Sequence, residues 1–268
     1  MDQQDEFERL VSEAVRQDFS GWDFSYIDER WRTSPTSWDY RQRIVGRVSQ
    51  AASLLDMGTG GGEFLASLVP LPVDTCATEC YPPNVPIARE RLEPLGVQVI
   101  EPKNEEDLPF EDARFDLVIN RHESFSASQV YRVLKPGGLF ITQQVGGRDN
   151  IRLNALLGAG VALDYSDWGL ESAVQELEAD GLQVVEQCEE FPETVLSDIG
   201  AVVYYLRAIP GQITDFSGEA YCPQLRALHN LIQATGELHI RSHRFYIEAQ
   251  RGPEEISGWM QSPAPKLP

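Results

Sequence analysis

The feature that most constrains the fold is a short apolar run that leads into a glycine-rich turn. Residues 51–55 are mostly apolar and are typical of a buried parallel strand, and Asp56 follows them. Residues 63–68 then start a helix. In an α/β sheet, a strand, a glycine turn and a helix in this order build a ligand pocket at the carboxyl edge of the strands. Because the chain turns sharply and a ligand approaches the backbone closely, the turn needs its three alternating glycines, Gly58, Gly60 and Gly62.

The glycine spacing argues against a dinucleotide-binding turn. A dinucleotide fingerprint would place glycine at positions 58, 60 and 63, where the third glycine lets helix and strand pack together. Position 63 holds Glu63 instead, and a carboxylate at a helix start repels a pyrophosphate. An NAD-dependent oxidoreductase is therefore only a weak alternative.

The pattern from Asp56 to Gly62, Asp-x-Gly-x-Gly-x-Gly, resembles the first motif of the class I S-adenosylmethionine-dependent methyltransferases, in particular the methyltransferase type 11-like domains. Further motifs follow in order: an acid at Glu79 after the next strand, an acidic stretch that begins at Asn104, and Leu-Lys-Pro-Gly-Gly before an apolar strand. The resemblance covers residues 54–145 motif by motif and the rest of the chain more loosely.

This resemblance implies an α/β, Rossmann-like sheet of seven mostly parallel strands with helices on both faces. The last strand would be antiparallel and inserted beside the fifth. We expect a helical and aromatic cap at 1–50 and the methyltransferase domain at 51–250, with an insertion around 151–235 and a tail at 251–268.

The resemblance also assigns S-adenosylmethionine as the cofactor. A carboxylate can accept hydrogen bonds from two hydroxyl groups, and Glu79 matches the family's ribose-binding acid. Cys80 matches the residue that packs on adenine, and Asn104 stands where the family usually has an aspartate for the adenine amino group. An amide oxygen accepts more weakly than a carboxylate. The expected cofactor-binding residues are Asp56, Gly58, Thr59, Gly60, Gly62, Glu79, Cys80, Asn104, Glu105, Asn120 and Arg121.

The implied reaction is transfer of the sulfonium methyl group to an O, N or C nucleophile by in-line displacement. The protein's task is then to align the acceptor, and a base matters only if the acceptor carries a proton. His122 follows the strand at 115–120 and has an unperturbed pKa suited to proton transfer near neutral pH. We take it as the candidate general base; the alternative is a histidine that makes only a backbone contact.

An aromatic-rich segment at 19–40 and an apolar block at 199–206 are the candidates for a cap over the pocket. The block reads as a helix of an insertion, and residues 221–235 read as another helix. The aromatic side chains either attach this segment to the core or line a substrate pocket, and both can hold. The expected substrate-binding residues are Tyr26, Trp31, Trp38, Tyr40, Gln144, Asn154 and Tyr204.

The net charge of the chain disfavours some classes of binding partner. The formal net charge is −20, and no Lys/Arg cluster stands out in the sequence, which disfavours long nucleic acid and anionic membrane as partners. We expect a small, partly apolar acceptor. An RNA or protein methyltransferase is one alternative, and a non-catalytic S-adenosylmethionine-binding module is another.

The cysteines and histidines do not suggest a metal site. Cys76 and Cys80, and likewise His239 and His243, are spaced like pairs of ligands, but neither pair has enough further ligands nearby. We therefore expect no metal and reduced thiols, as in a cytoplasmic protein. The sequence leaves the oligomeric state open.

Overall fold

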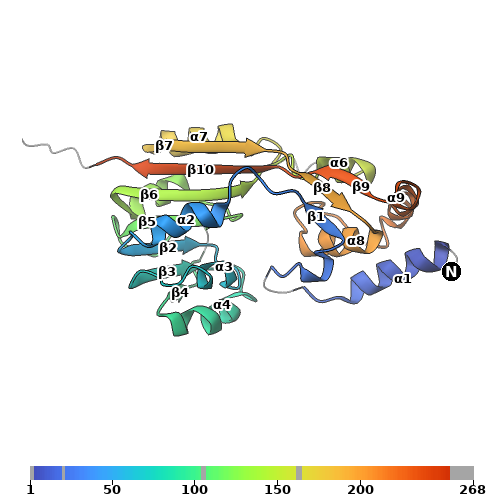
Figure 1. Cartoon of the computed structure of the whole chain (residues 1–268), viewed down its shortest axis with the longest axis horizontal. Coiled ribbons are helices and arrows are strands. Elements are labelled where there is room, and N and C mark those ends of the chain that lie inside the picture. The colour runs from blue at the N-terminus through green and yellow to red at the C-terminus, as the bar shows by residue number, and fades with distance from the viewer. Residues whose placement is uncertain (1–2, 20–21, 104–106, 161–164, 254–268) are drawn as a thin grey trace, which may run out of the picture.

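The computed structural model describes residues 3–19, 22–103, 107–160 and 165–253, which form two lobes along the long axis of the molecule (Figure 1). The larger lobe is built on a seven-stranded sheet. The smaller one, called the cap lobe below, contains a three-stranded sheet with helices around it. No helix in these ranges is both long and apolar enough to cross a membrane.

The large sheet confirms the expected Rossmann-like fold. Its strand order is β4-β3-β2-β5-β6-β10-β7. Adjacent strands from β4 to β6 pair in parallel, whereas β10 pairs antiparallel with both β6 and β7. The last strand therefore lies beside the fifth of the core strands, as the resemblance implies. The strands are β2 (Ser53–Met57), β3 (Asp74–Thr78), β4 (Gln98–Ile100), β5 (Phe115–Arg121), β6 (Leu134–Val145), β7 (Leu182–Glu190) and β10 (Arg244–Arg251).

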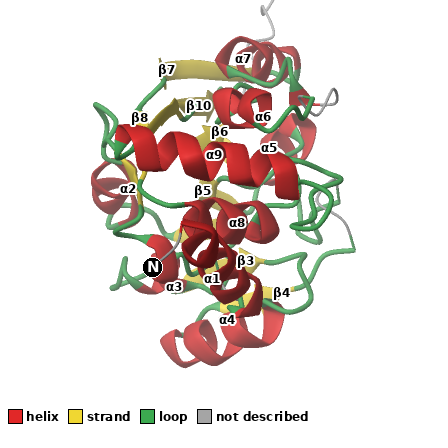
Figure 2. Cartoon of the chain, turned by 90° about the vertical axis from the view of Figure 1, so that its right-hand side faces the viewer, coloured by secondary structure: helices red, strands yellow, loops and turns green. Residues whose placement is uncertain are grey.

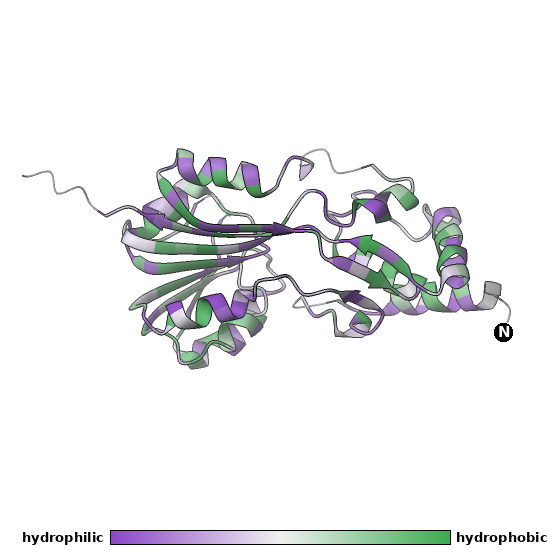
Figure 3. Ribbon diagram, turned by 45° about the horizontal axis from the view of Figure 1, so that its top comes forward, coloured by the Kyte–Doolittle hydropathy of each residue, from purple (hydrophilic) through white to green (hydrophobic). Residues whose placement is uncertain are grey.

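Helices cover both faces of this sheet because successive side chains of a strand point to opposite sides. Leu54 packs in a core with α2, α3 and α4, whereas its neighbour Leu55 packs in a second core with α5 and α7. Asp39 starts α2 by accepting a hydrogen bond from the Gln42 N–H at 3.0 Å. Figure 3 shows hydrophobic residues concentrated on the central strands. The helices are α2 (Tyr40–Val48), α3 (Glu63–Ala66), α4 (Val85–Leu92), α5 (Ala127–Val133) and α7 (Leu170–Ala179), with a 3-10 turn, η2, at Glu93–Leu95.

The cap lobe is assembled from segments far apart in the sequence. Its sheet has the order β1-β8-β9, with all pairs antiparallel. One hydrophobic core joins this sheet to α1, α6, α8 and α9, and Figure 2 shows α8 and α9 lying across this end of the molecule. Helices were expected near α8 and α9, but the small sheet was not. The elements are α1 (Gln3–Arg16), η1 (Ser25–Ile27), β1 (Trp31–Thr33), α6 (Ile151–Leu156), β8 (Glu193–Leu196), α8 (Ile199–Ala208), α9 (Cys222–Thr235) and β9 (Leu238–Arg241).

The chain passes between the lobes at several points, and at two of them a strand of one sheet leads directly into a strand of the other. Strand β7 continues into β8 after Phe191 and Pro192, and β9 continues into β10 after Ser242 and His243. Helix α2, although N-terminal, packs on the large sheet and not in the cap lobe.

Replacing Val118 by Ala tests the core of the large lobe. Val118 is fully buried in β5, so the change should lower the free energy of unfolding by about 2–3 kcal/mol through lost burial and a residual cavity. Val73→Ala is the matched control, because Val73 is 100% exposed, and its effect should stay within about 0.5 kcal/mol. Urea denaturation of both variants measures the difference, and equal effects would contradict the core assignment.

Candidate functional site

The glycine turn joins β2 to α3 at the carboxyl edge of the large sheet. Gly58, Gly60 and Gly62 have φ angles of +69°, +61° and +81°, which lie in the left-handed region that glycine adopts without the steric cost of a Cβ. The Thr59 N–H donates to the Thr78 carbonyl at 2.9 Å, so the turn is fixed to the end of β3. A ligand at this edge can approach bare backbone.

Two buried carboxylates flank the turn. Asp56 in β2 is 4% exposed, and Glu79, the first residue after β3, is 3% exposed. Burial raises the pKa of Asp56 to about 7; Thr59 and the Arg121 charge oppose this rise, and the Glu79 charge adds to it. Glu79 also accepts a hydrogen bond from the Tyr81 N–H at 2.7 Å. The site thus presents acceptors that are shielded from water.

Two side chains lie over the glycine turn. A Cβ added at Gly58 would overlap the Glu123 side chain, and one added at Gly60 would come within 2.9 Å of the Trp22 ring. Trp22 is 51% exposed and has a φ of +57°. The cavity left beside the turn measures about 10 Å³, roughly the room of one water molecule. It is lined by Met57, Gly58, Thr78, Cys80, Pro102, Leu108, Glu123 and Ser124.

The residues around the turn fit an adenosyl sulfonium compound in their chemistry. The glycines leave free the space that Cβ atoms would fill, and the buried carboxylates can accept ribose hydroxyls or face a cation. Cys80 and Leu108 give the cavity an apolar side suited to a base. A ligand of that size enters only when Glu123 and Trp22 move away from the turn.

His122 lies at the end of β5 in a defined hydrogen-bonded arrangement. The Trp38 indole N–H donates to Gln143 Oε1 at 2.8 Å, which turns the Gln143 amide nitrogen toward His122 Nε2 at 2.9 Å. An amide nitrogen only donates, so His122 Nε2 must accept and the ring proton must sit on Nδ1. Burial and the charges of Arg244 and Arg121 lower the pKa of His122 well below its ordinary value. Solvent reaches the ring, but the protein atoms around it still penalise the charged form.

Three of the expected ligand residues instead form a buried network under the loop that carries Glu123. The Tyr40 hydroxyl donates to the Asn120 carbonyl at 2.7 Å. Gln144 Nε2 donates to Asn120 Oδ1 at 2.6 Å and to the Glu123 carbonyl at 2.9 Å, and Thr142 adds a bond to Asn120 Oδ1 at 3.0 Å. Burial raises the pKa of Tyr40 well above its ordinary value. This network holds the loop in place beside the turn.

The other expected substrate residues lie mostly inside the cap lobe. The rings of Tyr26 and Tyr204 are 4.9 Å apart, and Trp31 stacks on Tyr205 at 4.0 Å. Asn154 is 3% exposed and donates to the Gln212 carbonyl at 3.0 Å. Trp38 alone of this aromatic group reaches the sheet edge, through Gln143.

Some residues at the site were not anticipated, and two that were expected lie outside the described ranges. Trp22, Glu123 and Gln143 are not among the expected site residues, although Trp22 lies in the aromatic segment, Glu123 in the stretch after β5 and Gln143 in a pair of adjacent glutamines near the expected pocket edge. Asn104 and Glu105 fall in the stretch 104–106, which the structure does not describe.

The state of the His122 ring gives a direct test of the arrangement at β5. We expect ¹⁵N NMR to show a neutral imidazole with its proton on Nδ1 at pH 6, because Gln143 occupies Nε2 and two arginines oppose protonation. Gln143→Glu places a carboxylate beside Nε2, so the His122 pKa should rise; Gln250→Glu, on the exposed part of β10, is the matched control. A ring that is already charged at pH 6 in the unmodified protein would refute the arrangement.

Comparison with known proteins agrees with this geometry. Residues 55–142 match a family model described as a methyltransferase domain. The ubiquinone biosynthesis O-methyltransferase of Cereibacter sphaeroides is 32% identical over 119 residues, which are 41% of this chain and 48% of that protein. The chain thus spans about half the length of that curated relative.

Solved structures share the fold. One from Bacillus halodurans, described as a methyltransferase, is 17% identical and has a TM-score of 0.58; the match covers 79% of this chain and 98% of that one. The cyclase SpnF, 16% identical with a TM-score of 0.51, covers 92% of this chain and 93% of its own. At such identities the likeness shows the fold alone. Residues 55–142 are therefore similar to a methyltransferase domain, and the sheet around them has the fold that these solved structures share.

Proposed function

We propose that the protein transfers the methyl group of S-adenosylmethionine to an O, N or C atom of a small, partly apolar acceptor. The observation that carries this proposal is the left-handed glycine turn between two buried carboxylates, Asp56 and Glu79, within the matched domain. The cofactor supplies a methyl group that is already activated. The work left to the protein is binding, alignment in line with the acceptor, and exclusion of water, and such positioning is worth up to about 7–11 kcal/mol.

Each site residue then has a stated task. Glu79 accepts hydrogen bonds from the ribose hydroxyls, Asp56 faces the positive charge, and Cys80 packs on the base. The turn lets the ligand lie against bare backbone. Asn104 and Glu105 remain the candidates for the adenine edge, from the resemblance alone.

His122 remains the candidate catalytic residue. Its lone pair on Nε2 is engaged by Gln143, so it can take a proton from an acceptor only after that hydrogen bond is exchanged. Until then the free Nδ1–H can only donate. Its lowered pKa keeps the ring neutral and therefore available as a base throughout the physiological pH range.

Two observations support a small acceptor. The net charge of −20 disfavours a polyanionic substrate such as RNA, which a basic surface would have to hold. The curated relative is named as an O-methyltransferase of ubiquinone biosynthesis, and on that relationship we favour an oxygen nucleophile on a partly apolar molecule.

The second candidate function is a non-catalytic binding module. It is favoured by the position of Glu123 and Trp22, whose side chains fill the space over the glycine turn. The similar fold of a protein named as a cyclase indicates that this architecture can also support reactions other than methyl transfer. A protein methyltransferase stays a further alternative, and labelling of a protein acceptor would reveal it.

Gly60→Ala tests the cofactor site against a matched control. A Cβ at position 60 projects onto the ligand side of the turn, so the affinity for S-adenosylhomocysteine should fall by about 100-fold in titration calorimetry. Gly137 has a φ of +80° and nothing near its Cβ position, so Gly137→Ala carries the same backbone strain without reaching the site. Equal losses in both variants would contradict the site assignment.

Transfer itself is measured with methyl-labelled S-adenosylmethionine and a metabolite extract. Labelled small molecules that require an intact Gly60 establish the enzyme. Binding of S-adenosylhomocysteine without any labelled product favours the binding module. Tight binding of NADH in place of S-adenosylhomocysteine would overturn both.

The raised pKa of Asp56 predicts that cofactor binding depends on pH. Its pKa of about 7 means that the carboxyl is mostly protonated at pH 6 and mostly ionised at pH 8. Because the ionised form attracts a cation, the affinity for S-adenosylmethionine should rise roughly tenfold between these pH values. Asp56→Asn should bind more weakly at pH 8 and lose the dependence; a dependence that persists in this variant would show that another group causes it.

A further inference from the structure

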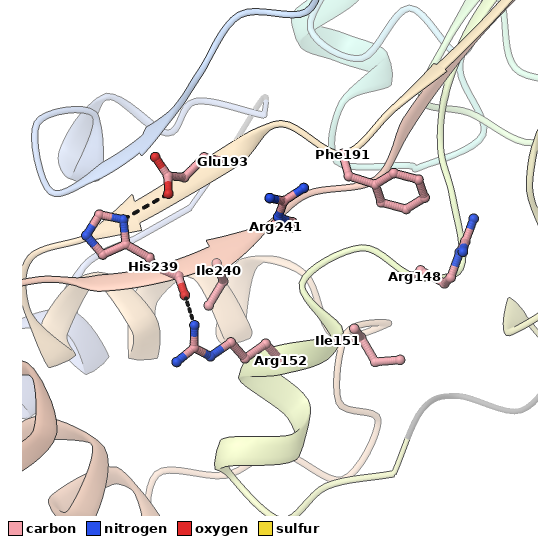
Figure 4. A pocket seen from close by; sticks show the side chains of 8 residues that line it. All are labelled: Arg148, Ile151, Arg152, Phe191, Glu193, His239, Ile240 and Arg241. Carbon is pink, nitrogen blue, oxygen red and sulfur yellow. Dashed lines mark hydrogen bonds and ion pairs between the residues drawn. The ribbon is translucent and has the colours of Figure 1, made fainter.

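A second pocket, of about 490 Å³, lies on the links between the two lobes (Figure 4). Its volume is in the range of small-molecule sites, and it shares no lining residue with the cavity at the glycine turn. Its residues come from the end of β6, from α6, from the β7–β8 link and from β8 and β9. They are Arg148, Ile151, Arg152, Phe191, Glu193, His239, Ile240 and Arg241.

Three arginines line this pocket, and two of them, Arg152 and Arg241, form no ion pair with a described carboxylate. Among the described residues, Arg152 donates to the backbone carbonyl of His239, at 2.8 Å. Arg148 lies over the Phe191 ring at 4.5 Å and forms a long ion pair, 3.9 Å, with Glu189. The side chain of Arg241 makes no hydrogen bond or ion pair with any residue that the structure describes.

Arginines without a carboxylate partner are unusual in a chain with 42 acidic and 22 basic residues. Other arginines that connect segments far apart in the sequence form ion pairs with carboxylates. Arg30 lies 3.3 Å from Asp198, and Arg43 lies 2.6 Å from Glu186. With carboxylates in excess, two arginines without such partners, beside a third that is only distantly paired, make the lining of this pocket locally positive.

Glu193, the one acidic residue that lines the pocket, is hydrogen-bonded to His239. Glu193 Oε1 lies 3.1 Å from His239 Nδ1, and since a carboxylate only accepts, the histidine nitrogen donates. Figure 4 shows this pair at one end of the pocket, whereas Arg148 and Phe191 lie at the other and Arg241 lies between them. Among the labelled arginines, Arg241 therefore lies nearest the middle of the pocket.

We propose that this pocket binds a small dianion, namely a phosphate group, either free or carried by a small organic molecule. Guanidinium groups bind phosphate through paired N–H donors, and Arg241, with no described partner of its own, offers such a pair to the pocket. Ile151 and Ile240 offer apolar surface to an attached carbon skeleton. Because the arginines belong to different segments of the two lobes and their links, one bound phosphate would join these segments and raise the melting temperature.

A long polyanion does not suit this pocket. Nucleic acid gains affinity by contacting many phosphates over a basic face, whereas here three arginines stand in a strongly acidic chain. A single phosphate group needs only the pocket itself.

Calorimetry in a phosphate-free buffer tests the proposal, with inorganic phosphate and phenyl phosphate as ligands and phenol as the uncharged comparison. We expect saturable binding of at least one phosphate at about 1 mM or below and none of phenol. Arg241→Gln should weaken binding about tenfold without changing the melting temperature of the free protein, because Arg241 makes no contact to lose. Arg32→Gln is the matched control, since Arg32 is on the same small sheet but pairs with Glu237 outside the pocket.

The outcomes separate the sources of the phosphate. Equal affinity for both ligands indicates the free anion, tighter binding of phenyl phosphate indicates an organic phosphate, and both support the proposal. No saturable binding of either phosphate, or an equal loss of affinity in Arg32→Gln and Arg241→Gln, would overturn it. None of these readouts depends on methyl transfer.

Discussion

The site depends on keeping two carboxylates out of water at the ends of neighbouring strands. The parallel register sets Met57 of β2 beside Thr78 of β3, so the glycine turn and Glu79 leave the sheet side by side. Burial of Asp56 beside a second acid disfavours its ionised form, and its pKa of about 7 is the consequence. The fold thus holds a destabilising arrangement that a bound cation with hydroxyl groups would relieve.

A second layer of polar groups keeps the loop after β5 beside this pair. Asn120, Thr142 and Gln144 are buried at the ends of β5 and β6, and their hydrogen bonds end on the backbone of Glu123. Buried polar groups are tolerated when their partners are supplied, and such a network then specifies one geometry. This buried network therefore positions the loop, while the hydrogen bonds from Trp38 to Gln143 and from Gln143 to His122 orient the His122 ring.

The large lobe could be predicted because its signals are local. The apolar run before Asp56, the spaced glycines and the acid at position 79 each reflect contacts within a few residues or between adjacent parallel strands. The sequence does not show which way a side chain points. Tyr40 and Gln144 are residue types that often bind ligands, yet both are buried and form hydrogen bonds with Asn120. The cap sheet was missed because β1 has three residues and its partner in β8 lies about 160 positions further along the chain, so only tertiary packing defines it.

Both sites lie where elements of the cap lobe meet elements of the large lobe. Trp22 follows α1, and its neighbour Phe19 packs against Tyr204 of α8, so the ring over Gly60 belongs to the cap lobe. Arg241 ends β9 in the same lobe, while Arg148 follows β6 of the large sheet. Trp22 therefore lies over the turn from the cap lobe, and the second pocket likewise takes its arginines from both lobes.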